Sequence, residues 1–589
     1  MERCLNSDGF LIRGIIATLA VTILVFTDIL AATTALAQEE RIVEGQQIYE
    51  TRWEGISDGL FGAVGSIDVR YSRNTVPRTD GSTDWAATAW RGERVSGQFV
   101  LWTKTGTEQV RLSVTRPVSR SGEEIPPSSI RPCFVSYVLG DGDLHGDVLD
   151  PVERLDIPPQ SVQPIWLSID VPAGIRPGTY EGGLTVRAAG TTPLTFNISI
   201  EVLPNTLPPP RQWSFHLDLW QNPWAVARYH RVRPWSEEHW SLLRPHLEML
   251  AQIGQKCLTT TIVNRPWNGQ TFDPYSTMVR WRREDDGGWS FDYSLFDEYV
   301  RFGAECGLDG AINCYSMVPW GYRFYYHDAR TGDLEWIEAR PGSEQYSDMW
   351  TAFLSSFSTH LRQLGWFERI VIAMDERSVE DMLQVVSLVR EVDPELKLAL
   401  AGGDHQELYD AVHDYCFYIG NRIEPELMAS RRRLGHISTF YVCCNPPRPN
   451  TFTFSPPPES AWLGWFAAAN HYDGMLRWAA ISWTRDPLED TSFGNWPAGD
   501  CFLHYPGPRS SIRFERLREG IQDYEKILIL RTFLEARGSS GIRGIDLLDE
   551  ALSPFRYPDP GDDEALAGNL ARAKRILEEL SLQISKQAR

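Results

Sequence analysis

The chain is short of positive charge, with 57 lysines and arginines against 78 aspartates and glutamates in 589 residues. The resulting net charge of -21 argues against nucleic acid and anionic membrane as partners, because both repel an acidic protein. It suits a soluble protein that acts on a neutral or cationic ligand. The oligomeric state is left open by the sequence.

Cysteines are also few. Eight of the nine follow the N-terminal segment, mostly far apart and in apolar, strand-like stretches. No CxxC or HExxH motif occurs, so a zinc site is not expected, and we predict no metal or organic cofactor. The spacing does not select a disulfide pair, and we expect most of these residues to be buried free thiols.

Long apolar runs are confined to the N-terminus. Arg3 and Arg13 precede an apolar run over 14–26, and the small residues at 35–37 are typical of a cleavage site. We therefore expect an export signal over 1–37 and a periplasmic or extracellular protein. The run is short for a spanning helix and Asp28 follows it, so stable membrane insertion is not expected, although an uncleaved anchor stays an alternative.

Residues 38–210 have the pattern of a β-sandwich domain. Short segments rich in Val, Ile, Thr and aromatic residues alternate with Gly and Pro, which predicts antiparallel strands. The acidic loop from Asp141 to Asp147 has oxygen ligands that calcium prefers, but it lacks the spaced terminal Glu of an EF-hand loop. A solvated turn is therefore favoured over a calcium site. Three prolines at 208–210 form a stiff linker that ends the domain.

After the linker, strand-like and helix-like stretches alternate. Eight such units over 211–540 predict a (β/α)8 catalytic barrel, and the charged tail over 541–589 predicts a helical extension packed outside it. An open doubly wound sheet is the alternative fold. That fold normally has a Gly-rich phosphate loop after its first strand, and residues 218–223 are not Gly-rich. The predicted strands are 213–219, 256–263, 310–317, 369–374, 396–401, 415–419, 438–443 and 475–483.

Two adjacent carboxylates, Asp375 and Glu376, close the fourth predicted strand. In such barrels the chemistry sits at the carboxyl ends of the strands, and acids at that edge suit the hydrolysis of sugars. The alternative is that both residues only begin the next helix, where acidic side chains are favoured. Polar and aromatic residues at the other strand ends are predicted to bind the substrate: Asp218, Trp220, Tyr315, Asp404, His405, Tyr441, Trp483, Trp496 and Tyr505.

Several motifs resemble those of one enzyme family. The run Trp496-Pro-Ala-Gly-Asp500, the Tyr505-Pro-Gly turn and the charged stretch 513–525 are similar to the C-terminal signature of glycoside hydrolase family 123, as is the acidic pair after the fourth strand. The stretches 89–94 and 266–297 also fit. The resemblance covers most of 85–530. It implies a sandwich followed by a barrel, β-N-acetylgalactosaminidase-like activity, and Asp375 and Glu376 as the catalytic residues.

Neighbouring acids favour one mechanism. A retaining enzyme with its own nucleophile needs carboxyl groups about 5 Å apart on opposite sides of the glycosidic bond, which residues adjacent on one strand supply poorly. Substrate assistance, in which a 2-acetamido oxygen attacks C1, needs only one acid and one carboxylate to orient the acetamide. We assign Glu376 as acid/base and Asp375 as orienter, and expect the like-charged neighbour to raise the pKa of one of them.

The predicted reaction is removal of a terminal β-linked N-acetylhexosamine, which the resemblance implies is N-acetylgalactosamine, from a glycan or glycoconjugate. Two alternatives stay open. One is a barrel glycosidase with a different substrate and a distant nucleophile. The other is a carbohydrate-binding surface protein without activity, which the intact acidic pair disfavours.

Overall fold

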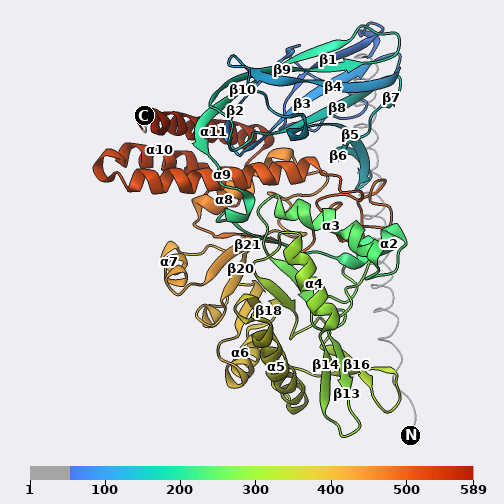
Figure 1. Cartoon of the computed structure of the whole chain (residues 1–589), viewed down its shortest axis with the longest axis vertical. Coiled ribbons are helices and arrows are strands. Elements are labelled where there is room, and N and C mark those ends of the chain that lie inside the picture. Colours follow the sequence, from blue (N-terminus) through green and yellow to red (C-terminus); the bar gives the residue numbers. More distant parts are fainter. Residues whose placement is uncertain (1–52, 588–589) are drawn as a thin grey trace, which may run out of the picture.

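The computed structural model describes residues 53–587, so the predicted export segment lies outside the described residues. The chain forms three layers along its longest axis: a pair of β-sheets, a group of long C-terminal helices, and a barrel (Figure 1). Within the described part of the chain, no helix is both long and apolar enough to cross a membrane.

The first layer is the predicted sandwich. Its strands pair antiparallel, except that β10 and β2 run parallel. Apolar side chains from the two sheets, Phe99, Phe134, Ile165 and Phe196 among them, are fully buried between them. The first sheet is ordered β1 (Leu60–Gly65), β3 (Arg94–Thr103), β8 (Ser161–Asp170), β5 (Ile130–Gly140) and β6 (Asp143–Asp150). The second is ordered β2 (Asp84–Arg91), β10 (Leu194–Thr206), β9 (Gly178–Arg187), β4 (Thr107–Ser119) and β7 (Leu155–Ile157).

The last layer is the predicted barrel of parallel strands, and the doubly wound alternative is wrong. Its strands are β11 (His216–Leu219), β12 (Leu258–Thr261), β15 (Ile312–Tyr315), β18 (Ile370–Asp375), β19 (Lys397–Gly402), β20 (Asp414–Tyr418), β21 (Ile437–Tyr441) and β22 (Gly474–Arg477). From β12 to β22, each strand pairs with the next barrel strand along the chain, and β22 pairs with β11. The barrel is nearly closed, since β11 and β12 share no ladder.

Glutamine side chains span the seam between β11 and β12. Gln221 accepts a hydrogen bond from the Thr259 amide at 2.9 Å, and Gln255 donates to the Leu219 carbonyl at 2.9 Å. These amides satisfy backbone groups that would otherwise be buried without a partner, which costs about 1–3 kcal/mol each.

Helices cover the outside of the barrel. Ser236, Ser343 and Ser378 cap three of them, each accepting a hydrogen bond from a first-turn amide. Between β19 and β20 the expected helix is only a short 3-10 turn, Gln406–Leu408. The helices are α2 (Pro223–His230), α3 (Glu237–Ala251), α4 (Ser294–Glu305), α5 (Glu344–Leu364), α6 (Val379–Val392), α7 (Pro425–Arg433) and α8 (Pro457–Ala469).

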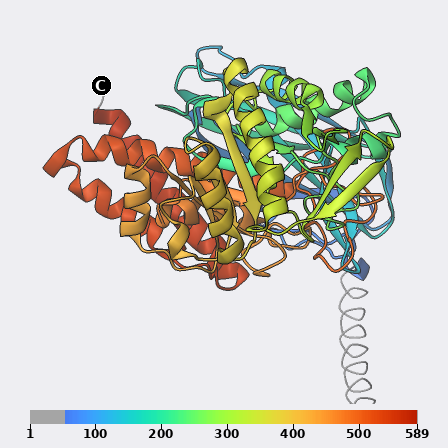
Figure 2. The ribbon, with the colours of Figure 1, turned by 90° about the horizontal axis from the view of Figure 1, so that it is seen from below.

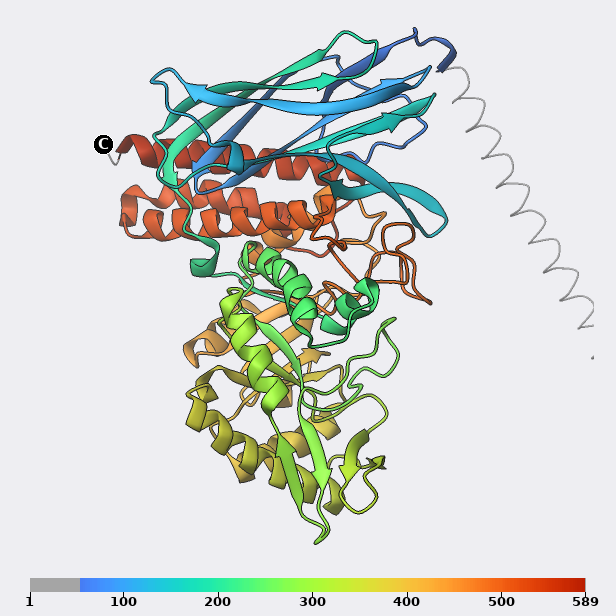
Figure 3. The same cartoon turned by 45° about the vertical axis from the view of Figure 1, so that its right-hand side comes forward.

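A separate four-stranded sheet, which the sequence did not predict, extends from the barrel loops. It is ordered β14 (Trp289–Asp292), β13 (Arg280–Arg283), β16 (Arg323–Asp328) and β17 (Leu334–Glu338). These strands follow β12 and β15, and they project at the end of the molecule away from the sandwich (Figures 1 and 3).

Three C-terminal helices make up the middle layer: α9 (Ile512–Glu535), α10 (Ile542–Leu552) and α11 (Asp563–Gln587). They lie to one side of the barrel when it is seen from below (Figure 2). Ion pairs hold them in place: Lys574 of α11 contacts Glu519 of α9 at 2.7 Å, and Lys526 of α9 contacts Glu93 of the sandwich. The charged stretch 513–525 is therefore a buried structural helix.

Candidate active site

The acidic pair lies at the mouth of the barrel. Asp375 ends β18, whose preceding residues are all buried, and Glu376 follows it. Both line an open cavity at this mouth. The other lining residues are Trp220, Gln270, Trp320, Ala401, Tyr441, Cys443, Cys444, Leu476, Trp478, Trp496 and Asp500.

The backbone turns sharply at Glu376. Its φ is +40°, a left-handed conformation that is unusual for a residue with a long side chain, and its amide donates to the Ala401 carbonyl of β19 at 2.6 Å. This bond fixes the turn immediately after the strand. Rare backbone conformations of this kind persist where the surroundings enforce them, and they are concentrated at functional sites.

Asp375 is half-buried and held by an indole. Trp320 Nε1 donates to Asp375 Oδ2 at 3.2 Å, and the Arg377 guanidinium stacks on the Trp320 ring at 4.1 Å. Burial and the neighbouring Glu376 raise the pKa of Asp375 to about 7, against the opposing effect of the Trp320 hydrogen bond. The expected pKa rise within the pair thus falls on Asp375.

Glu376 is exposed to the cavity and has a different partner. The Tyr441 hydroxyl, at the end of β21, donates to Glu376 Oε1 at 2.8 Å. The two carboxylates are therefore held by different side chains, Trp320 from the loop after β15 and Tyr441 from the end of β21. Such an arrangement lets one act as a proton donor while the other stays a hydrogen-bond acceptor.

Aromatic rings form the cavity wall. Trp478 and Trp496 meet edge to face with centroids 5.7 Å apart, and Trp496 Nε1 donates to the Gln270 carbonyl at 3.0 Å. Trp220 packs against Trp267 and Tyr315 with centroids 4.7 and 4.5 Å apart. An aromatic wall beside a carboxylate pair suits the apolar face of a sugar ring.

The comparisons with known proteins agree with this geometry. Residues 220–530 match the model of the glycoside hydrolase 123 catalytic domain, and residues 64–188 match that of the family's N-terminal domain. The chain belongs to glycoside hydrolase family 123. It is a glycoside hydrolase, as the sequence predicted.

A solved structure supports the same assignment. A family 123 glycoside hydrolase from Clostridium perfringens, described for glycolipid glycan hydrolysis, aligns with TM-score 0.83 and 26% identity over 90% of this chain and 99% of its own. A Bacteroides ovatus GH5 xyloglucanase gives TM-score 0.28 at 9% identity, over 75% of this chain and 99% of its own. That likeness is too slight to inform function. No curated protein matches the chain.

Three of the predicted substrate-binding residues line the same cavity as the acidic pair: Trp220, Tyr441 and Trp496. Asp218 and Tyr315 lie beneath it. Asp218 Oδ2 accepts hydrogen bonds from Asn313 at 2.8 Å and from Trp220 Nε1 at 3.3 Å, and burial raises its pKa to about 7. Asp218 and Tyr315 therefore support Trp220 from the barrel interior rather than line the cavity.

Four other residues predicted to bind the substrate do not line the cavity. Trp483 is fully buried and donates to the His504 carbonyl at 2.9 Å, so it is a core residue. Tyr505 is also fully buried, with its hydroxyl bonded to Asp147 of the sandwich at 2.7 Å. Asp404 and His405 lie outside the cavity, because the chain leaves β19 toward Tyr409 and Tyr415, whose hydroxyls bond the Asp404 carboxylate and the His405 amide.

Sequence reasoning missed Trp320 and Gln270. Both lie in loops after β15 and β12, where no periodicity indicates which side chain turns toward the barrel axis. The Pro319-Trp320-Gly321 turn is the only local signal for Trp320. Trp478, which follows β22 and was not among the predicted substrate-binding residues, lines the cavity together with Trp496.

No group of His, Cys, Asp or Glu side chains within residues 53–587 is arranged to hold a metal ion. The hairpin of β5 and β6 contains the acidic loop from Asp141 to Asp147, and we call it the acidic hairpin. Its Asp147 carboxylate is bound by Arg70, Arg513 and Tyr505. The cysteines of the same part of the chain are free thiols.

Proposed function

We propose that this family 123 enzyme removes a terminal β-linked N-acetylhexosamine, N-acetylgalactosamine above all, by substrate-assisted hydrolysis with retention at C1. The observation that carries the proposal is the acidic pair on one edge of the cavity, with Asp375 held by Trp320 and Glu376 by Tyr441. In the lining of the same cavity, Asp500 is the only further carboxylate, and its side chain is engaged by the buried Arg477 at 2.8 Å. This arrangement of the carboxylates in the cavity lining favours a nucleophile that belongs to the substrate rather than to the protein.

In the first step, ionised Asp375 accepts the acetamido N–H, which directs the acetamido oxygen at C1. A bond forms between that oxygen and C1 as the bond to the leaving oxygen breaks, and Glu376 donates its proton to the leaving oxygen. The ring that results is an oxazolinium-type ion. Its positive charge is stabilised by the adjacent Asp375 carboxylate.

In the second step, water attacks C1 from the face that the aglycone left. Glu376 accepts the proton of the water, and the bond between C1 and the acetamido oxygen breaks, which regenerates the acetamide and the protonated acid. Two inversions at C1 give net retention. Trp478 and Trp496 are proposed to contact the apolar face of the sugar.

The proposed setting is outside the cytoplasm. The N-terminal pattern over 1–37 supports export, and the substrate class is a glycan or glycoconjugate. Glycolipid is the substrate named for the C. perfringens relative, and we include glycolipid glycans in the proposed range.

A panel of 4-nitrophenyl glycosides tests the proposal. We expect turnover of the N-acetyl-β-galactosaminide, with the β-galactoside and β-glucoside inert. A thiazoline mimic of the cyclic intermediate should bind more tightly than product, because it resembles a species nearer the transition state. Rapid hydrolysis of a sugar with a free 2-hydroxyl would instead establish the alternative, a conventional glycosidase with a second, distant carboxylate.

A further inference from the structure

The tip of one sandwich hairpin reaches the barrel loop that carries Trp496 and Asp500. We call residues 489–502 the pocket loop. Leu139, near the end of β5, donates from its amide to the Glu489 carbonyl at 2.8 Å and accepts from the Thr491 amide at 2.9 Å. The pocket loop is thus added to the edge of the hairpin like a short extra strand.

Asp141, at the hairpin turn, binds the pocket loop at two further points. Its carboxylate Oδ2 accepts a hydrogen bond from the Ala498 amide at 3.3 Å, and its own amide donates to Ser492 Oγ at 3.3 Å. The Asp141 backbone has a φ of +52°, which Asp, Asn and Gly adopt more readily than other residues. The residue therefore suits both the turn and the contact.

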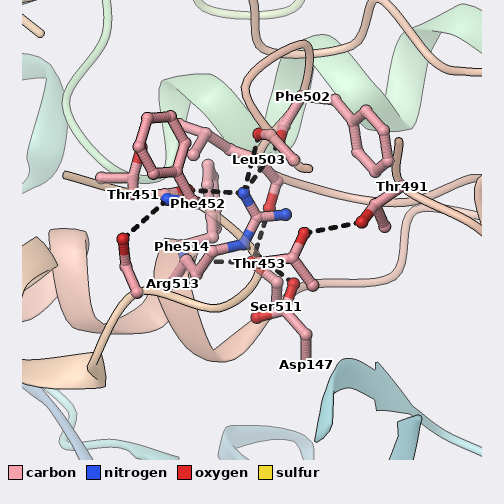
Figure 4. A network of polar contacts seen from close by, with 12 residues as sticks. Asp147, Thr451, Phe452, Thr453, Thr491, Phe502, Leu503, Ser511, Arg513 and Phe514 are labelled. Carbon is pink, nitrogen blue, oxygen red and sulfur yellow. Dashed lines mark hydrogen bonds and ion pairs between the residues drawn. The ribbon is translucent and has the colours of Figure 1, made fainter. Parts of the chain in front are cut away.

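Asp147, on the next strand of the hairpin, fixes the far end of the pocket loop through Arg513 (Figure 4). Arg513 Nε donates to Asp147 Oδ2 at 2.9 Å, and both side chains are fully buried. Arg513 Nη1 then donates to the carbonyls of Gly499 and Phe502, each at 3.0 Å. A guanidinium held by the sandwich thus fixes the backbone on both sides of Asp500.

We propose that the β5–β6 hairpin is a positioning element of the active site, with Asp141 and Asp147 as positioning residues. They hold the pocket loop so that Trp496 lies against Trp478 at the cavity wall. The acidic hairpin, which the sequence suggested was a solvated turn or a calcium loop, has this role instead. The effect on substrate rests on the proposed function, whereas the effect on the loop does not.

The test uses exposed Asp141, because variants of buried Asp147 risk misfolding. Asp141→Gly keeps the turn and removes the carboxylate, whereas Asp141→Asn keeps an oxygen acceptor and tolerates the same backbone. Asp143→Asn is the matched control, since Asp143 lies exposed on the same hairpin. Thr491→Val, which removes the hydroxyl that donates to the Leu139 carbonyl at 3.0 Å, is a second route to the same contact.

The first readout is hydrogen–deuterium exchange of the full chain by mass spectrometry. Exchange over 489–502 should accelerate in Asp141→Gly and Thr491→Val, and should stay at the wild-type rate in Asp141→Asn and Asp143→Asn. Unchanged exchange in both of the first two variants would overturn the proposal. This readout is independent of the substrate.

The second readout is kinetics on 4-nitrophenyl N-acetyl-β-galactosaminide. KM should rise about three- to tenfold in Asp141→Gly, the usual effect of one lost hydrogen bond, with a smaller change in kcat and rescue in Asp141→Asn. A faster-exchanging loop with an unchanged KM would reject the positioning role. A wild-type enzyme inactive on every N-acetylhexosaminide would reject the proposed function, while the exchange result would still decide whether the hairpin holds the loop.

Discussion

Trp320→Phe should shift the acid limb of the pH–rate profile to higher pH. The indole donates to Asp375 at 3.2 Å, and this bond lowers a pKa that burial and Glu376 have raised to about 7. Phenylalanine keeps a ring for the Arg377 guanidinium, which lies 4.1 Å from the Trp320 centroid, but it has no N–H to donate. The pKa of Asp375 should therefore rise in the variant.

The size of the shift follows from the strength of the bond. A hydrogen bond to a charged group contributes about 1.5–3 kcal/mol, and one pKa unit corresponds to about 1.4 kcal/mol, so the shift is about one to two units. Asp375 must be ionised to orient the acetamide, so activity is present above its pKa and is lost as the pH falls through it. At pH 6 the ionised fraction should drop from about a tenth to about a hundredth or less, whereas at pH 9 the ionised fractions of the two enzymes should differ by about twofold at most.

The assay is kcat/KM for a nitrophenyl N-acetyl sugar from pH 5 to pH 9. Trp496→Phe is the matched control, because its indole lines the same cavity but donates to the Gln270 carbonyl. We expect that variant to lose activity evenly across the range. If Trp320→Phe shows the wild-type acid limb with a uniform loss, the assignment of Asp375 as the ionised orienter is refuted.

Three further predictions concern single residues. Glu376→Gln should lower kcat on natural glycosides by about 10²–10⁴, with a smaller loss on an activated phenol that leaves without protonation; equal losses would count against the acid role. Asp375→Asn should slow even activated substrates, and near wild-type rates with a nitrophenyl N-acetyl sugar would exclude it as the orienter. Trp496→Ala should raise KM with little change in melting temperature. Trp483→Ala should instead cost about 3–5 kcal/mol of stability and leave KM unchanged in the folded fraction. The opposite result would make Trp483 the cavity residue and Trp496 the core residue.

The barrel and its acidic pair were predictable from sequence because parallel strands buried on both faces appear as continuous apolar runs. Residues 370–374 form such a run, and Asp375 ends it. The sheet of β13, β14, β16 and β17 gave no such signal, since strands such as Arg280–Arg283 carry charged residues and lie within loops.

Side-chain direction after a strand was not predictable. Trp483 and Trp496 both follow β22, yet one packs into the core and the other lines the cavity, because the path of the intervening loop decides which ring turns inward. Asp147 posed a similar problem. Its acidic sequence neighbours indicated a solvent-exposed turn. Its partner Arg513 lies 366 residues further along the chain, so the sequence near Asp147 gives no sign of this ion pair.

The most direct test of the central claim is the rate of hydrolysis of a series of nitrophenyl glycosides whose 2-acetamido group carries zero, one, two or three fluorines. Fluorine withdraws electrons from the acetamido oxygen, so if that oxygen is the nucleophile, kcat should fall steeply with each substitution. A rate that is independent of the number of fluorines would contradict substrate assistance and would require a nucleophile supplied by the protein.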